Sequence, residues 1–220
     1  MIVKQDGRNF EIHFEPSDLA RWKRFLDAFK PRMEREFDWW RTAPNSELWT
    51  AFVAEFVVRG GTRLIDKLKK DDNQWEEFVR NTSLQAPSKQ LREGLKTATR
   101  FWPQQARALD KCRRNNKVVR ENQVVLLAGF ETLHQEGQRS STVRERCPML
   151  GLKGASNFLI NVGAAKDLAA IDSRIVGCLR NHFGFDVRVD KVQSSQALYT
   201  ALESALREVA ASQWTDPGPT

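Results

Sequence analysis

The chain contains a lysine and an aspartate whose types and spacing could support covalent chemistry at a sugar carbon. Lys153 lies in the sequence GLKGAS, and Asp172 follows nineteen positions later in AAIDSRI. A neutral amine is a nucleophile that can attack C1′ of a deoxyribonucleotide, expel the base and form a Schiff base, from which β-elimination cuts the strand. An ionised carboxylate can stabilise positive charge on the sugar or accept a proton from the amine.

A tight turn is expected to place the lysine at the start of a helix. A short helical stretch, Thr142 to Cys147, ends near Pro148, and apolar residues recur at helical spacing from Ala155 to Val162. Glycine at position 151 leaves room for a DNA phosphate to approach the backbone N–H groups and the positive end of the next helix. The spacing predicts a helix-hairpin-helix over residues 142–163, with phosphate contacts from Leu150, Gly151, Leu152 and Gly154.

The aspartate is expected to begin a second helix. Asp172 precedes Ile175, Leu179 and Phe183, which share one helical face. An aspartate at this place can cap the exposed backbone N–H groups of the first turn, which favours its ionised form. The sequence therefore predicts an ionised carboxylate at a helix start.

Composition indicates a folded protein with affinity for phosphate. The 220 residues are 40% hydrophobic, carry a formal net charge of +7 and include three cysteines and three histidines. The cysteines, at positions 112, 147 and 178, lack the spacing of a zinc or iron–sulfur site, and the histidines are scattered. We expect a monomeric, cytoplasmic, nucleoid-associated protein that needs no cofactor and does not bind membranes.

The pattern of apolar residues predicts a mainly α protein with at most a short N-terminal strand element, over residues 9–14. We expect one unit, 1–220, of two helical lobes flanking a cleft, with an N-terminal extension at 1–41 and a tail at 213–220. Helices are expected over residues 19–40 with a break at Pro31, 47–59 ending at Gly60-Gly61, 62–70, 75–79, 89–97, from Pro103 to Cys112, 122–134 and 197–211. Residues 135–141 are polar, contain glycine and are expected to form a loop.

Three stretches of the chain resemble the helix-hairpin-helix DNA glycosylase superfamily, and within it the archaeal-type 8-oxoguanine DNA glycosylase/AP lyase branch. They are FVVRGGTRL at 56–64, RFWPQQA at 100–106 and GLKGASNFLINVG at 151–163 with its following aspartate. The resemblance implies that Lys153 forms the Schiff base and that Asp172 is its catalytic partner. Arg174 stands where many members carry a histidine near a phosphate, which implies a phosphate contact, although it could equally be a solvated arginine of the helix.

Two regions depart from the branch and bear on the base that is recognised. The branch keeps some base-reading residues in its C-terminal tail, where this chain has Trp214 and no terminal lysine. Trp214 is a candidate for stacking on an extruded base, although it could equally pack on the last helix. The tryptophans of the N-terminal extension, Trp22, Trp39 and Trp40, are expected in the core.

The resemblance implies an enzyme that binds double-stranded DNA and excises a modified base, with 8-oxoguanine expected. Two alternatives stay open at this point. The same fold could act on another base, such as an alkylated or hypermodified phage base, or it could be a non-catalytic helix-hairpin-helix module whose lysine contacts phosphate.

Overall fold

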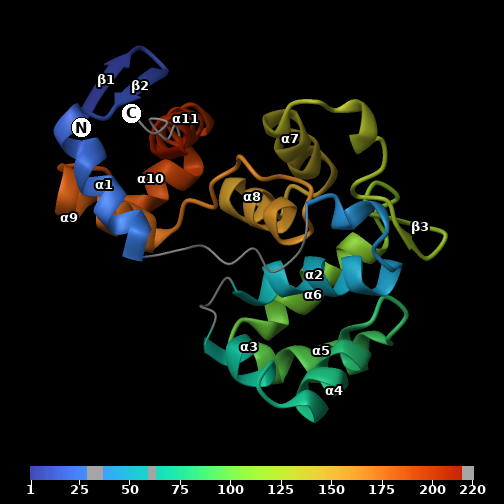
Figure 1. Ribbon diagram of the computed structural model, residues 1–220. Helices are drawn as coiled ribbons and strands as arrows, with labels where there is room; N and C mark the ends of the chain where they lie inside the picture. The colour runs from blue at the N-terminus through green and yellow to red at the C-terminus, as the bar shows by residue number, and fades with distance from the viewer. Residues whose placement is uncertain (29–36, 59–62, 215–220) are drawn as a thin grey trace. The chain divides into compact units, whose positions relative to one another are not determined.

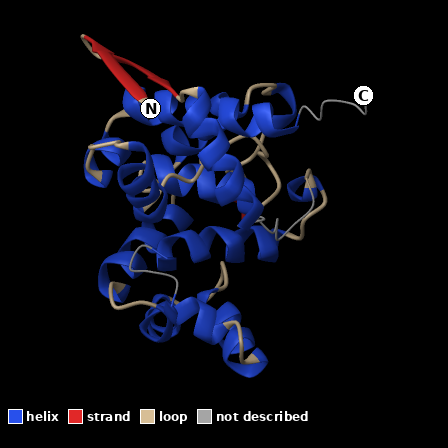
Figure 2. Ribbon diagram, turned by 60° about the vertical axis from the view of Figure 1, so that its left-hand side comes forward, coloured by secondary structure: helices blue, strands red, loops and turns tan. Residues whose placement is uncertain are grey.

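The computed structural model describes residues 1–28, 37–58 and 63–214, and helices dominate these ranges (Figure 2). The mainly α prediction is confirmed. The chain divides into two compact units, which we describe separately. Unit 1 comprises Met1–Glu34, Gly151–Ser156 and Asp167–Thr220, and unit 2 comprises Arg35–Leu150 and Asn157–Lys166. No helix among the described residues is both long and apolar enough to cross a bilayer.

Unit 1 combines a β-hairpin with helices from both ends of the chain (Figure 1). Strands β1 (Ile2–Asp6) and β2 (Asn9–His13) pair antiparallel around Gly7, which has a φ of +58° that favours glycine. Helices α1 (Pro16–Ala28), α9 (Ser173–Phe183), α10 (Val189–Ser194) and α11 (Gln196–Trp214) follow along the chain, and β2 packs against α11. The predicted N-terminal strand is confirmed and has a partner strand that the sequence analysis did not anticipate.

The core of unit 1 joins the N-terminal elements to the last three helices. Trp22 is 5% exposed, and its ring stacks on Phe183 with centroids 4.9 Å apart. Leu152, Ile171 and Tyr199 belong to the same apolar core. The prediction of core positions for the N-terminal tryptophans is confirmed for Trp22 and Trp40, while Trp39 is half-buried.

Unit 2 is organised around α2 (Asn45–Val57), which is buried on most sides as its dense apolar residues predict. The side chain of Phe52 is fully buried and contacts the rings of Trp49, Phe56 and Phe158. The other α-helices of the unit are α3 (Arg63–Leu68), α4 (Asp72–Thr82), α5 (Ser88–Ala98), α6 (Trp102–Arg113), α7 (Glu136–Arg146) and the later turns of α8 (Leu152–Asn161). The Gly60-Gly61 pair, predicted to end the second helix, lies outside the described residues.

The helix predicted for residues 122–134 is wrong. Strands β3 (Val119–Arg120) and β4 (Gln123–Val124) form a hairpin whose loop residues, Glu121 and Asn122, both have positive φ. Residues 125–134 are irregular apart from the 3₁₀ helix η3 (Phe130–Thr132). Their apolar side chains reach the core without helical hydrogen bonds because Arg146 donates to the carbonyl oxygens of Leu126 and Ala128, each at 2.8 Å.

The loop predicted for residues 135–141 is also wrong, since α7 begins at Glu136. The polar composition of these residues suggested a loop, but one of the polar residues, Arg139, is buried and anchors the helix in unit 2. Arg139 is 8% exposed, and its guanidinium donates to the carbonyl oxygens of Leu133 and Ala164 at 2.9 and 2.7 Å.

The long N-terminal helix predicted over residues 19–40 is shorter in the structure. Helix α1 ends at Ala28, residues 29–36 with Pro31 lie outside the described residues, and Trp39–Arg41 form the 3₁₀ helix η1. At the other end of the chain, α11 extends through Trp214, two residues into the predicted tail.

Candidate active site

Lys153 lies in the first turn of α8, as predicted. The preceding helix, α7, ends at Arg146, and Leu150 N–H donates to the Cys147 carbonyl oxygen at 3.0 Å to close the turn. The Gly151 carbonyl oxygen accepts the first hydrogen bond of α8, from Ala155 N–H at 2.9 Å. The residues around the lysine therefore form the hairpin between two helices that the spacing predicted, a helix-hairpin-helix.

The exposed residue of the turn is Gly151. Leu150 and Leu152 on either side of it are 2% and 7% exposed. The N–H groups of Gly151, Leu152, Lys153 and Gly154 donate to no acceptor in the described part of the chain, as is usual for a first helical turn. Gly151 is exposed, and a Cβ built there would have no neighbour within 4 Å, so no residue that the structure describes demands glycine at this position.

The Lys153 side chain is half-buried in unit 1. Its ammonium forms no hydrogen bond or ion pair with the residues that the structure describes. Neighbouring Leu152 is anchored in the core of unit 1, which fixes the start of the helix that carries the lysine.

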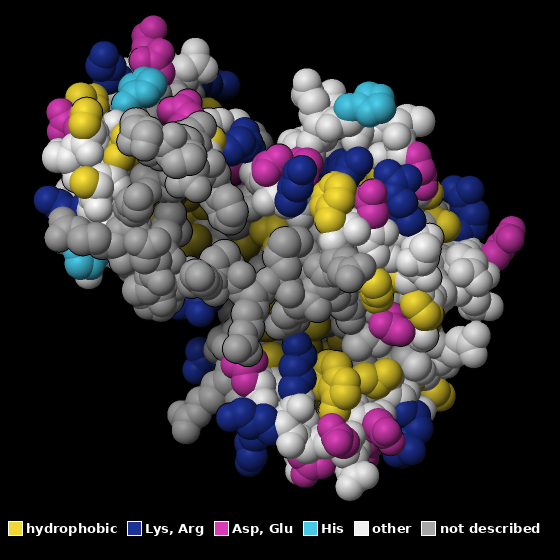
Figure 3. Space-filling view, in the orientation of Figure 1, with side chains coloured by type: hydrophobic (Ala, Val, Ile, Leu, Met, Phe, Trp, Pro, Cys, Tyr) yellow, Lys and Arg dark blue, Asp and Glu magenta, His cyan; other side chains and the backbone are white. Residues whose placement is uncertain are grey.

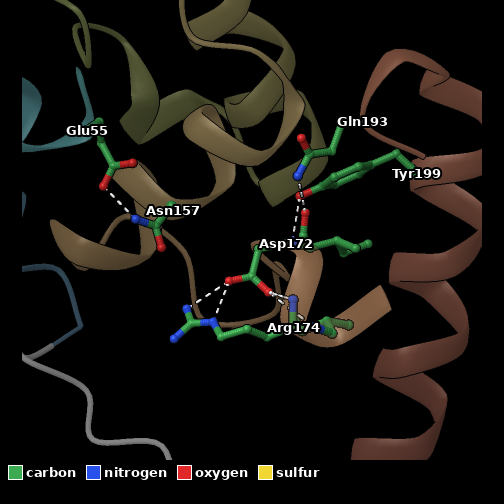
Figure 4. A network of polar contacts seen from close by, with 8 residues as sticks. Glu55, Asn157, Asp172, Arg174, Gln193 and Tyr199 are labelled. Carbon is green, nitrogen blue, oxygen red and sulfur yellow. Dashed lines mark hydrogen bonds and ion pairs between the residues drawn. The ribbon is translucent and has the colours of Figure 1, made fainter. Parts of the chain in front are cut away.

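Asp172 is the N-cap of α9, which confirms the predicted cap. One carboxylate oxygen, Oδ1, accepts from the backbone N–H groups of Arg174 and Ile175 at 2.9 and 3.1 Å. The other, Oδ2, accepts from the guanidinium of Arg174, at 2.8 Å from Nε and 2.7 Å from Nη2 (Figure 4).

These contacts determine the charge of the aspartate. Burial alone would raise the pKa of Asp172, but the N–H of Ile175 and the guanidinium and N–H of Arg174 outweigh burial and hold the pKa below its usual value. The carboxylate is therefore ionised at neutral pH, as its place at the helix start predicted.

Three residues that the sequence analysis did not single out hold the segment before Asp172. Tyr199 and Glu203 from α11 and Gln193 from α10 contact the backbone of Ala169 and Ile171. Figure 4 shows Tyr199 and Gln193 beside Asp172. No local pattern identifies them, because their partners lie 22 to 34 residues away in the sequence.

The remaining predicted site residues are placed as follows. Arg174 lies in the first turn of α9 with a side chain that is 84% exposed. Gly154 is half-buried in the first turn of α8. Trp214 is the last residue of α11, and its side chain lies outside the described residues. Across the described ranges, no three His, Cys, Asp or Glu side chains come together in a way that could hold a metal ion.

A family model described as 8-oxoguanine DNA glycosylase matches residues 63–214, which is more than half of the chain and includes Lys153 and Asp172. The chain belongs to the 8-oxoguanine DNA glycosylase family. It is therefore an enzyme of DNA repair, and the resemblance seen in the sequence is confirmed.

Two solved structures of 8-oxoguanine DNA glycosylases share the fold. The 8-oxoguanine glycosylase/lyase of Methanocaldococcus jannaschii, in complex with a 15mer DNA containing 8-oxoguanine, is 22% identical with a TM-score of 0.65, covering 90% of this chain and 87% of that one. The 8-oxoguanine DNA glycosylase of Thermotoga maritima is 20% identical with a TM-score of 0.62, covering 92% and 91%. No curated protein sequence matches the chain.

Proposed function

We propose that this glycosylase excises 8-oxoguanine from double-stranded DNA and cleaves the resulting site, with Lys153 as nucleophile and Asp172 as its acidic partner. The observation that carries the proposal is the pair itself. A lysine in the first turn of α8 and an ionised aspartate at the N-cap of α9 both lie in unit 1 and within the range that matches the family.

The reaction proceeds by exchange of bonds at C1′ of the damaged nucleotide. The Lys153 amine forms a bond to C1′ while the bond to the base breaks, and the base leaves with the electron pair and takes up a proton. Opening of the sugar ring gives a Schiff base, and loss of a C2′ proton expels the 3′ phosphate by β-elimination. The Asp172 carboxylate stabilises positive charge on the sugar and accepts a proton from the attacking amine.

The hairpin and Arg174 are suited to hold DNA phosphates. The N–H groups at the start of α8 point to an anion site at a helix N-terminus, and Leu150, Gly151, Leu152 and Gly154 contribute backbone to this turn. Arg174 uses Nε and Nη2 for Asp172, which leaves Nη1 of an exposed guanidinium for a phosphate oxygen.

Long-range attraction to DNA is expected from the net charge of +7. On the face shown in Figure 3, lysine and arginine side chains are interspersed with acidic ones and do not gather into one stripe.

Borohydride trapping tests the proposal. The protein is incubated with a duplex containing 8-oxoguanine and sodium borohydride, which reduces the Schiff base to a stable adduct visible on a denaturing gel. The wild type should be trapped and Lys153→Gln should not. Lys89→Gln is the matched control, because Lys89 also lies in the first turn of a helix, α5, and is exposed; it should be trapped like the wild type.

The other outcomes identify what is wrong. Trapping of Lys153→Gln at the wild-type level would remove Lys153 as the nucleophile. If the wild type were trapped only on duplexes with an alkylated or hypermodified base, that base would replace 8-oxoguanine as the proposed substrate. Binding without trapping or cleavage on any lesion would indicate a non-catalytic module.

A further inference from the structure

Tyr199 is the single tyrosine of the chain and is almost fully buried, with 2% of its surface exposed. Its hydroxyl donates to the carbonyl oxygen of Ala169 at 2.6 Å and accepts from the N–H of Ile171 at 3.0 Å. A side chain from α11 therefore bridges two backbone groups in the segment immediately before Asp172.

Two further side chains complete the same arrangement. Gln193 Nε2 donates to the Ile171 carbonyl oxygen at 2.9 Å, and Glu203 Oε1 accepts from the Ala169 N–H at 2.9 Å. All four backbone polar groups of Ala169 and Ile171 are thus bonded to side chains of α10 and α11, although this segment is neither helix nor strand. A partly buried segment without regular structure needs such partners, and here they fix its conformation.

The tyrosine hydroxyl is also influenced by the helix that carries the lysine. Ser156 is 1% exposed in α8, three residues after Lys153, and its hydroxyl lowers the pKa of the Tyr199 phenol. Burial raises the pKa of the Tyr199 phenol to about 12, against the opposing effects of Ser156 and of the Ile171 N–H. The hydroxyl therefore keeps its proton, and its hydrogen bond to Ala169, at every pH at which DNA excision is measured.

We propose that Tyr199 is a positioning residue of the active site, whose hydroxyl holds the Asp172 segment and the first turns of α8 in register. It touches neither the sugar nor the base and acts through Asp172 and Lys153. The inference rests on the catalytic roles of these two residues in the proposed function.

Removal of the hydroxyl should loosen this register without unfolding the protein. In Tyr199→Phe the ring still fills the core of unit 1, and the Ile171 N–H keeps its 3.0 Å bond to the Ala169 carbonyl oxygen. A displacement of about 1 Å between reacting groups can cost about 100-fold in rate. The variant should therefore bind DNA normally and react slowly.

Single-turnover excision on an 8-oxoguanine duplex tests the inference, with the dissociation constant measured on the same duplex. Tyr199→Phe should lower the rate constant by about 10- to 100-fold and change the dissociation constant by less than about twofold. Thr82→Val is the matched control, because it also removes a buried hydroxyl, bonded to Phe78 of α4 in unit 2. Its rate constant should equal that of the wild type.

A double-mutant cycle separates positioning from a general loss of stability. Ser156→Ala should slow excision less than Tyr199→Phe, and the double variant should be no slower than Tyr199→Phe alone, since both changes break one junction. Additive losses, or a wild-type rate for Tyr199→Phe, would overturn the inference. If the wild type itself is neither trapped by borohydride nor active, the proposed function fails instead.

Discussion

Arg174 donates from both Nε and Nη2 to one oxygen of Asp172, at 2.8 and 2.7 Å, while its own backbone N–H donates to the other oxygen. The arginine side chain is 84% exposed and the aspartate side chain 19% exposed, so a solvent-facing cation holds a largely buried anion. The two residues are two positions apart, and the helix start between them sets the geometry. Together with the Ile175 N–H, Arg174 therefore holds the pKa of Asp172 below its usual value.

Substitution of the arginine should shift the pH dependence of excision. Asp172 has a lowered pKa, so its ionised form persists as the pH falls and is lost only when the pH passes below that value. In Arg174→Gln one of the lowering contacts is absent and the pKa rises, so the acid limb of the single-turnover rate profile should move to higher pH. Rates measured from about pH 4 to pH 8 cover the range around the ordinary pKa of an aspartate.

The control for this shift is Arg188→Gln. Arg188 and Asp190 form a similarly spaced, exposed ion pair, and the guanidinium lowers the pKa of Asp190 in the same way. Its pH profile for excision should match that of the wild type. An unchanged acid limb in Arg174→Gln would show that Asp172 does not limit the rate at low pH.

Asp172→Asn should separate the cap from the chemistry. The amide oxygen can still accept the N–H groups of α9, so the free energy of unfolding should fall by only about 1 kcal/mol. Without the negative charge, single-turnover excision should slow on the order of 100-fold. Asp71→Asn changes an equivalent cap, on α4, and should lower stability similarly without slowing excision; equal rates in the two variants would refute the catalytic role of Asp172.

A buried carboxylate in unit 2 should matter for stability. Glu55 is 3% exposed, and its Oε1 accepts from Asn157 at 2.5 Å (Figure 4) and from Asn161 at 2.9 Å, both on α8. Glu55→Leu leaves both amides without this acceptor and should lower the free energy of unfolding by about 2–4 kcal/mol in urea titrations. Glu55→Gln retains an oxygen acceptor and should cost less than half as much; a leucine variant as stable as the wild type would contradict this role.

The two buried cysteines should resist alkylation. Cys112 and Cys147 lie with their sulfurs 3.6 Å apart, and the hydrogen bond between them together with burial raises the pKa of the Cys112 thiol. Iodoacetamide at neutral pH should modify Cys178 first, because it is more exposed than the other two cysteines, and Cys112 only after unfolding. Mass spectrometry identifies the modified residues. Early modification of Cys112 in the native protein would show that this part of the core opens readily.

Sequence reasoning succeeded where the cause is local. The cap at Asp172 and the place of Lys153 in a first helical turn follow from a few adjacent residues, and both are confirmed. The apolar stretch after Asn122 was wrongly predicted to be a helix. An irregular chain can bury the same side chains when an arginine, here Arg146, donates hydrogen bonds to its carbonyl oxygens. Tyr199 was missed because its partner Ile171 lies 28 residues away.

The composition of the two units has a consequence for synthesis on the ribosome. Unit 1 takes its elements from Met1–Glu34 and from Asp167–Thr220, with unit 2 almost entirely between them. The elements β1, β2 and α1 therefore cannot form their core contacts until α11 has been synthesised, whereas the helices of unit 2 can pack earlier. We expect the hairpin at residues 2–13 to reach its native surroundings only after unit 2 has formed, although it is synthesised before unit 2.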